Sequence, residues 1–178
     1  VNHLEILDQD PGQEDTAALL EAAAEQANEA ISDHVKAHPE TEGMGTTLST
    51  MLFNGTNFGV CHVGDSRGYL LRDGKLEQIT KDDTYVQSLV DKGELDPGDV
   101  SSHPQKSLIL KAYTGRPVEA TLFTLDAKPG DRILLCSDGL SDPVTASTIE
   151  TALGQGSIEQ AGSTLVDLAI RSGGPDNV

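Results

Sequence analysis

The sequence contains no tryptophan, three phenylalanines and three tyrosines, so its core must be built mainly from aliphatic side chains. Basic residues are also scarce, at 12 against 29 acidic residues, and the formal net charge is −17. A charge of that sign argues against nucleic acid and anionic membrane surfaces as direct partners. The excess of acidic residues is typical of a solvated acidic surface, and it also fits a pocket that binds a cation through several carboxylates.

Long apolar runs are absent as well. No stretch approaches the roughly 20 apolar residues that a membrane-spanning helix needs, and no secretory signal peptide is visible. The two cysteines, Cys61 and Cys136, each lie in an apolar run, and no CxxC spacing occurs. Buried free thiols in a reducing compartment are therefore favoured over a disulfide framework or a zinc site. We expect this chain to be cytoplasmic, with any membrane anchor of the parent protein lying outside it.

The order of periodic segments predicts an α+β fold. A length of 178 residues suits one domain. Apolar positions spaced by three and four predict an amphipathic helix from Asp15 to about Val35. Strands are predicted over residues 46–53, 58–65, 69–71, 76–79, 121–125 and 131–136, the first four as an antiparallel meander. Helices are predicted over residues 84–92, 145–153 and 157–170.

Aspartates stand at the ends of several apolar runs. Asp65 follows one run, Asp138 and Asp142 follow another, and Asp176 lies in the Gly/Pro-rich segment GGPDNV. Each can cap a turn, and Asp65 can also pair with the nearby Arg67. As a set they match the hard oxygen ligands that Mg²⁺ and Mn²⁺ prefer. Spacing along the chain leaves open whether they converge in the fold.

Several short motifs occur in order over almost the whole chain: GMGTTL (43–48), VGDSRGYL (63–70), ITKDDTYVQSLVDKGEL (79–95), SHPQKSLI (102–109), CSDGLSD (136–142) and GGPDNV (173–178). Together they resemble the metal-dependent protein phosphatase (PPM) family, the type 2C Ser/Thr phosphatases. The likeness is greatest to actinobacterial members that oppose membrane Ser/Thr kinases. It implies a four-layer α-β-β-α sandwich of two antiparallel sheets, here without its first strands and its last strand.

The resemblance also implies metal ligands and a reaction. In the family the SDG and PDN aspartates bind a catalytic metal, which implies that role for Asp138 and Asp176. The family also binds a third, weaker metal, and the resemblance implies Asp65, Asp138 and Asp142 as its ligands. Two Mn²⁺ or Mg²⁺ ions would then activate a water that hydrolyses phosphoserine or phosphothreonine. No catalytic residue beyond the metal ligands is implied.

Other candidate residues lie around these acids. The flap of the family, which influences substrate choice, corresponds to about residues 82–115. Within it, Ser102 and His103 are candidate substrate contacts. Arg67 and Asn177 are expected to support the site, Arg67 by pairing with a nearby carboxylate and ordering its turn.

The chain lacks two family segments. These are R-x-x-N-E-D, which supplies a phosphate-binding arginine and an acid, and D-G-M-G-G, whose aspartate bridges the catalytic metals. We therefore expect residues 1–178 to be a single but partial catalytic domain, truncated at both ends, with weak or no activity by itself. Unpaired sheet edges in such a domain favour a strand-exchanged oligomer.

The expected partners are phosphorylated proteins and Ser/Thr protein kinases. Two alternatives remain open from the sequence. One is a pseudophosphatase that binds or regulates without a full metal centre, and the other is a phosphatase dedicated to one regulator of a sigma factor.

Overall fold

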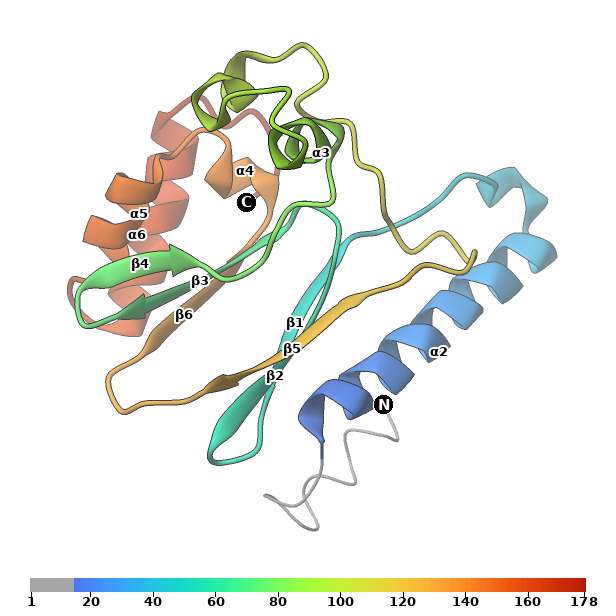
Figure 1. Cartoon of the computed structure of the whole chain (residues 1–178), viewed down its shortest axis with the longest axis horizontal. Coiled ribbons are helices and arrows are strands. Elements are labelled where there is room, and N and C mark those ends of the chain that lie inside the picture. Colours follow the sequence, from blue (N-terminus) through green and yellow to red (C-terminus); the bar gives the residue numbers. More distant parts are fainter. Residues whose placement is uncertain (1–14) are drawn as a thin grey trace. The chain divides into compact units, whose positions relative to one another are not determined.

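The computed structural model describes residues 15–178 and divides into two compact units (Figure 1). The first comprises Val1–Gly64 with Ile109–Ala127, and the second comprises Asp65–Leu108 with Lys128–Val178. Each contains helices and one three-stranded antiparallel sheet, which confirms the predicted α+β fold with two antiparallel sheets. Within residues 15–178, no helix is both long enough and apolar enough to cross a bilayer.

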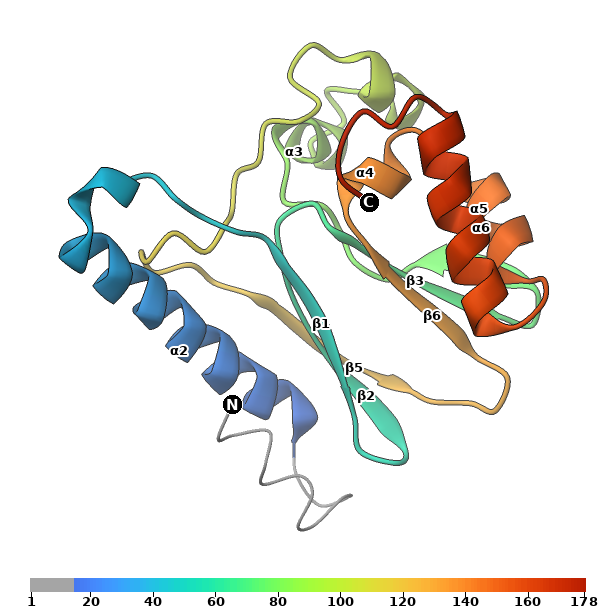
Figure 2. The same cartoon turned by 180° about the vertical axis from the view of Figure 1, so that it is seen from behind.

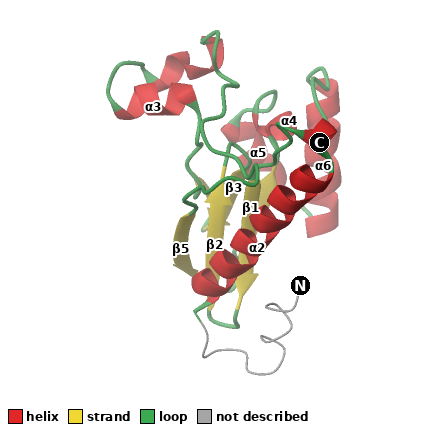
Figure 3. Cartoon of the chain, turned by 90° about the vertical axis from the view of Figure 1, so that its right-hand side faces the viewer, coloured by secondary structure: helices red, strands yellow, loops and turns green. Residues whose placement is uncertain are grey.

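The first unit packs one long helix against its sheet. The helix α2 (Thr16–Ala37) begins at Asp15, whose carboxylate accepts the N–H groups of Ala17 and Ala18, as the sequence predicts. Figure 3 shows α2 running across the strands, and its apolar face joins Cys61 and Val63 in the core. The central strand is β2 (Asn57–Val63), flanked by β1 (Leu48–Phe53) and β5 (Thr121–Asp126), and the 3₁₀ turn η1 (Pro39–Thr41) follows α2.

The second unit carries the other sheet, with β3 (Arg67–Arg72) between β4 (Lys75–Gln78) and β6 (Arg132–Cys136). Two helices, α5 (Ala146–Leu153) and α6 (Ile158–Arg171), pack on this sheet (Figure 2). Three shorter elements are α3 (Tyr85–Asp91), η2 (Pro97–Ser102) and α4 (Asp138–Ser141).

The prediction of a four-stranded meander is wrong at its centre. β1 pairs with β2 and β3 pairs with β4, but β2 and β3 belong to different sheets, where they pair with β5 and β6. The chain leaves the first sheet at Gly64, whose φ of +110° is a conformation that favours glycine. A Cβ at this position would collide with the Thr47 side chain. Both runs are apolar, so their pattern carried no information about which strand each one pairs with.

Capping hydrogen bonds between residues close in the sequence mark the starts of the predicted helices. Thr84 accepts the N–H of Gln87 at the start of α3, and Ser157 with Gln160 forms both bonds of a capping box at α6. The sequence pattern predicts a strand over residues 131–136 and no element at residues 138–141, so the short helix α4 is an addition to the prediction. Asp138 is in fact the first residue of α4.

An ion pair joins β3 to the loop before β6. The Arg72 guanidinium donates to both carboxylate oxygens of Asp131, at 2.9 and 2.7 Å, and the Lys128 N–H donates to one of them at 2.8 Å. These bonds, led by that from Arg72, lower the pKa of the Asp131 carboxyl to about 2. The ionised carboxylate therefore stabilises the folded state above the ordinary aspartate pKa, and this stability is lost as the pH falls through about 2.

We expect Asp131→Asn to lower the free energy of unfolding by about 1–2 kcal/mol at pH 6, because it removes charge-assisted hydrogen bonds. The difference from the wild type should shrink between about pH 4 and pH 2, as Asp131 becomes protonated in the wild type. Urea unfolding at several pH values measures it. Asp33→Asn is the control, since the Asp33–Lys36 pair is exposed and should contribute little. An Asp131→Asn difference that does not change with pH would contradict this assignment.

Candidate functional site

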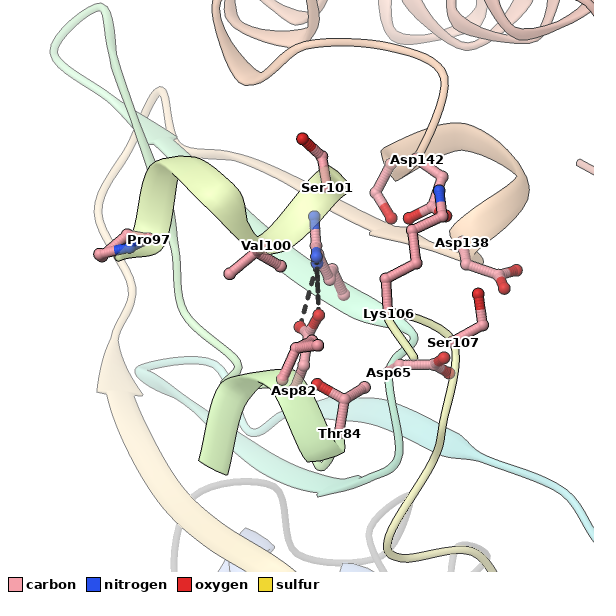
Figure 4. Close-up of a pocket in the computed structure, with 13 residues that line it drawn as sticks. Asp65, Asp82, Thr84, Pro97, Val100, Ser101, Lys106, Ser107, Asp138 and Asp142 are labelled. Carbon is pink, nitrogen blue, oxygen red and sulfur yellow. Dashed lines mark hydrogen bonds and ion pairs between the residues drawn. The ribbon is translucent and has the colours of Figure 1, made fainter. Parts of the chain in front are cut away.

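Three of the predicted metal ligands line one pocket of the second unit (Figure 4). Asp65 lies just before β3, Asp138 begins α4, and Asp142 follows α4. The cavity encloses about 260 Å³, which is enough for a hydrated ion or a phosphoryl group. Residues from three distant parts of the sequence, near positions 65, 82–107 and 138–142, thus face one small space.

The pocket concentrates negative charge. Burial raises the pKa of the Asp65 carboxyl, and the neighbouring charges of Asp138, Asp82 and Asp142 raise it further. Across residues 15–178, no three Asp, Glu, His or Cys side chains are grouped closely enough to hold a metal ion as they stand. The pocket therefore has the right type of oxygen donor for a hard cation, but the donors are not drawn together around one point.

Arg67 is held by Asp82 and not by Asp65. Its Nε and Nη2 atoms donate to the Asp82 carboxylate at 2.7–3.0 Å, and Gln78 donates to the same carboxylate at 3.0 Å. Burial alone would lower the pKa of the Arg67 guanidinium, but the hydrogen bonds and charge of Asp82 raise it above its ordinary value. This bidentate pair fastens the start of β3 to the segment that leads into α3.

The GGPDNV segment lies against α4, and the C-terminal residue is drawn beside that helix in Figures 1 and 2. The Ser137 hydroxyl donates to the carbonyl oxygen of Asn177 at 3.3 Å. The Asp176 carboxylate accepts the N–H of Asn177 at 2.7 Å. Asp176 is not among the residues that line the pocket, although its neighbour Asn177 contacts the helix that carries Asp138.

Gly139 makes this contact possible, since a Cβ there would collide with the Asn177 carbonyl oxygen. We expect Gly139→Ala to lower the free energy of unfolding by about 1–3 kcal/mol through overpacking. Denaturant unfolding measures this change. The control is Gly162→Ala on α6, where nothing lies within 4 Å and where alanine should stabilise the helix by about 0.5–1 kcal/mol. Equal effects from both substitutions would contradict a close approach at Gly139.

The two flap candidates make local contacts and do not line the pocket. His103 Nδ1 accepts the N–H of Gln105 at 3.1 Å, and the Ser102 hydroxyl donates to the Asp99 carbonyl at 2.9 Å. Their neighbours Ser101, Lys106 and Ser107 line it instead, with Thr84 and Asp82. Sequence reasoning missed these residues. The available signal is that all of them except Ser101 lie in the recognised motifs at 79–95 and 102–109.

The cysteines are both free thiols, as predicted, although Cys136 is only half-buried. Burial raises the pKa of the Cys61 thiol, and it raises the pKa of Cys136 to about 11. A thiol with such a pKa stays protonated at neutral pH and is a poor nucleophile. Neither cysteine is therefore suited to covalent catalysis.

Comparison with known proteins identifies the class. Residues 2–163 match the family Protein phosphatase 2C. The chain belongs to this family, the PPM Ser/Thr phosphatases, as its motifs indicate.

Its relatives include bacterial phosphatases. The chain is 55% identical over 172 residues to the serine/threonine protein phosphatase PstP of Mycobacterium tuberculosis, a match that covers 97% of this chain and 34% of PstP. It is 31% identical over 167 residues to the serine/threonine phosphatase stp of Listeria monocytogenes, covering 93% of this chain and 66% of that protein. The chain thus spans about a third of PstP.

Solved structures agree with the fold. A crystal structure of M. tuberculosis PstP matches with a TM-score of 0.93 and 53% identity, over 99% of this chain and 75% of that chain. The catalytic domain of PstP in complex with two manganese ions matches with a TM-score of 0.89 and 50% identity, over 99% and 74% of the two chains.

Proposed function

We propose that this chain supplies metal ligands to a Mn²⁺- or Mg²⁺-dependent phosphatase that hydrolyses phosphoserine and phosphothreonine in proteins. One observation carries the proposal: the aspartates of the GDSR and SDG motifs, Asp65 and Asp138, line the same pocket as Asp142. Membership of the protein phosphatase 2C family supports the reaction, and the manganese ions in the PstP structure support the metal.

The donor chemistry of the pocket suits a hard divalent cation. Asp65, Asp138 and Asp142 offer carboxylate oxygens, and burial, followed by the negative charge of the neighbouring aspartates, raises the pKa of the Asp65 carboxyl. We assign these three side chains to the weaker metal, and Asp138 with Asp176 to a catalytic metal. When bound, such ions supply a hydroxide nucleophile at neutral pH and neutralise charge on the phosphoryl oxygens.

Other pocket residues would orient the substrate. Thr84, Ser101 and Ser107 line the pocket, and their hydroxyl groups are of the type that donates hydrogen bonds to phosphoryl oxygens. The Arg67–Asp82 pair holds the turn that carries Asp65, so this carboxylate keeps its position beside α4. We keep Ser102 and His103 as candidate contacts of the protein substrate outside the pocket.

We further propose that the substrates are phosphorylated proteins and that Ser/Thr protein kinases oppose the enzyme. A cytoplasmic location, checked by cell fractionation of the parent protein, and a single partial domain with a flap at about residues 82–115 also stay predictions. So does the strand-exchanged oligomer. Sedimentation velocity tests the prediction of an oligomer, and a monodisperse monomer would contradict it.

A phosphatase assay tests the function directly. This chain and a version preceded by the R-x-x-N-E-D and D-G-M-G-G segments are incubated with a phosphothreonine peptide in Mn²⁺ and then in EDTA. We expect weak release of phosphate from this chain and strong, EDTA-sensitive release from the extended one, because the bridging carboxylate holds two cations against their repulsion. Strong release from this chain would contradict only the expectation of weak activity. No release from either protein would contradict the function and favour the pseudophosphatase.

A further inference from the structure

Two cationic side chains, Arg67 and Lys106, line the acidic pocket in the described part of the chain. They differ in what holds them. Arg67 makes a bidentate pair with Asp82, and these side chains are only 23% and 10% exposed. Arg67 is therefore fixed by its own partner, and Lys106 is the cation that faces the remaining carboxylates.

Lys106 pairs with one of the proposed metal ligands. Its Nζ lies 3.2 Å from Oδ2 of Asp142, and Figure 4 shows the side chain extending from its loop toward α4. The two side chains are 43% and 38% exposed. Water can reach this pair, and the contact is monodentate. The ion pair is therefore weak, and another cation can replace Lys106 at Asp142.

The backbone at Lys106 is held independently of this pair. The Lys106 N–H donates to the His103 carbonyl at 3.1 Å, and the Leu108 carbonyl accepts the Tyr85 N–H at 2.9 Å. The Lys106 side chain can thus leave Asp142 by rotating about its own bonds while its loop remains anchored to α3.

We propose that the Lys106 ammonium is an internal counter-ion of the pocket, which a divalent cation must displace from Asp142 in order to bind. This inference rests on the proposed metal site and adds a residue that sets its affinity. A carboxylate oxygen that accepts from an ammonium is less available to a metal, and a positive charge beside the site repels an incoming cation. Lys106 therefore lowers the affinity of the pocket for metal, and metal binding releases Lys106 into the pocket as a mobile cation.

The test is calorimetric titration of Mn²⁺ into chains freed of metal with EDTA. We expect Lys106→Met to bind Mn²⁺ about tenfold more tightly than the wild type, as expected for removing one charge several ångströms from a divalent ion near solvent. Lys106→Arg keeps the charge and should keep the wild-type affinity. Circular dichroism checks that each variant is folded, and Lys106→Gln replaces the methionine variant if that one is not.

Lys81→Met is the matched control. Lys81 belongs to the same unit and forms an exposed pair with Asp91 at 2.6 Å, but it does not line the pocket. Its loss changes the net charge equally and should leave the Mn²⁺ dissociation constant within about twofold of the wild type. A similar tightening in Lys81→Met and Lys106→Met would reduce the effect to overall charge and overturn the inference.

Asp142→Asn separates failure of this inference from failure of the metal site. If Mn²⁺ binding is weakened by Asp142→Asn but Lys106→Met binds like the wild type or more weakly, the counter-ion role is wrong and the metal site stands. If no variant binds Mn²⁺, or if Asp142→Asn binds as the wild type does, the proposed site at Asp142 is wrong and the inference is overturned with it.

Discussion

Replacing Asp138 with asparagine should weaken Mn²⁺ binding to this chain by about 100-fold or more, because loss of a direct ligand exceeds the effects known for supporting residues. Asp138 is the one residue shared by both proposed ligand sets, and it begins α4. Burial is the main cause of the raised pKa of Asp65, and the charge of Asp138 raises it further. Asparagine keeps the shape of the side chain and removes its charge, so the fold should be retained. Calorimetric titration with Mn²⁺ measures the effect.

Asp99→Asn is the control for this prediction. Asp99 lies in η2 of the same unit, is exposed, and does not line the pocket. The Asp99→Asn substitution should leave the affinity for Mn²⁺ unchanged. In the extended protein, Asp138→Asn should abolish EDTA-sensitive release of phosphate. Wild-type affinity in Asp138→Asn would show that the metal is held elsewhere.

Arg67→Met should lower the free energy of unfolding by about 3–5 kcal/mol, the usual cost of leaving one partner of a largely buried ion pair uncompensated. The Asp82 side chain is only 10% exposed, and it would keep Gln78 as its remaining donor among the bonds described above. Urea unfolding measures the change. Since methionine fills similar space, the loss reports the pairing more than the packing.

A double-mutant cycle sharpens this prediction. Asp82→Asn in the Arg67→Met background should recover part of the stability, because no unpaired charge then stays buried. Lys36→Met, which breaks an exposed pair with Asp33, should change stability by at most about 0.5 kcal/mol. A loss below about 1 kcal/mol in Arg67→Met would contradict the view that this pair fixes the start of β3.

The elements of the fold that are encoded locally could be predicted from the sequence. Asp15, Thr84 and Ser157 each cap the helix expected after them, since a cap depends on hydrogen bonds within a few residues. The pairing of β2 and β3 with β5 and β6 depends on contacts about 60 residues apart in the chain, as in Cys61 opposite Leu122. Such pairings leave no mark on local periodicity, and so the meander prediction failed at Gly64.

The candidate site likewise has residues that the sequence predicts and contacts that only the folded structure shows. Asp65, Asp138 and Asp142 could be named because they belong to recognised motifs, and the fold brings them to one pocket. The placement of Asp82 against Arg67 and of Lys106 against Asp142 spans 15 and 36 residues. Only the folded chain shows which oxygen each cation reaches. The sequence therefore indicates Ser102 and His103 as flap candidates and gives no sign of the contact between Lys106 and Asp142.

The position at which Mn²⁺ binds to this chain is the most direct test of the proposed metal site. Paramagnetic broadening of backbone amide signals by substoichiometric Mn²⁺ reports the position of the bound ion residue by residue. We predict the strongest broadening at Asp65, Lys106 and residues 138–142, and its loss in Asp138→Asn. Strongest broadening instead at the acidic face of α2, around Glu25, Glu29 and Asp33, would contradict the proposed metal site.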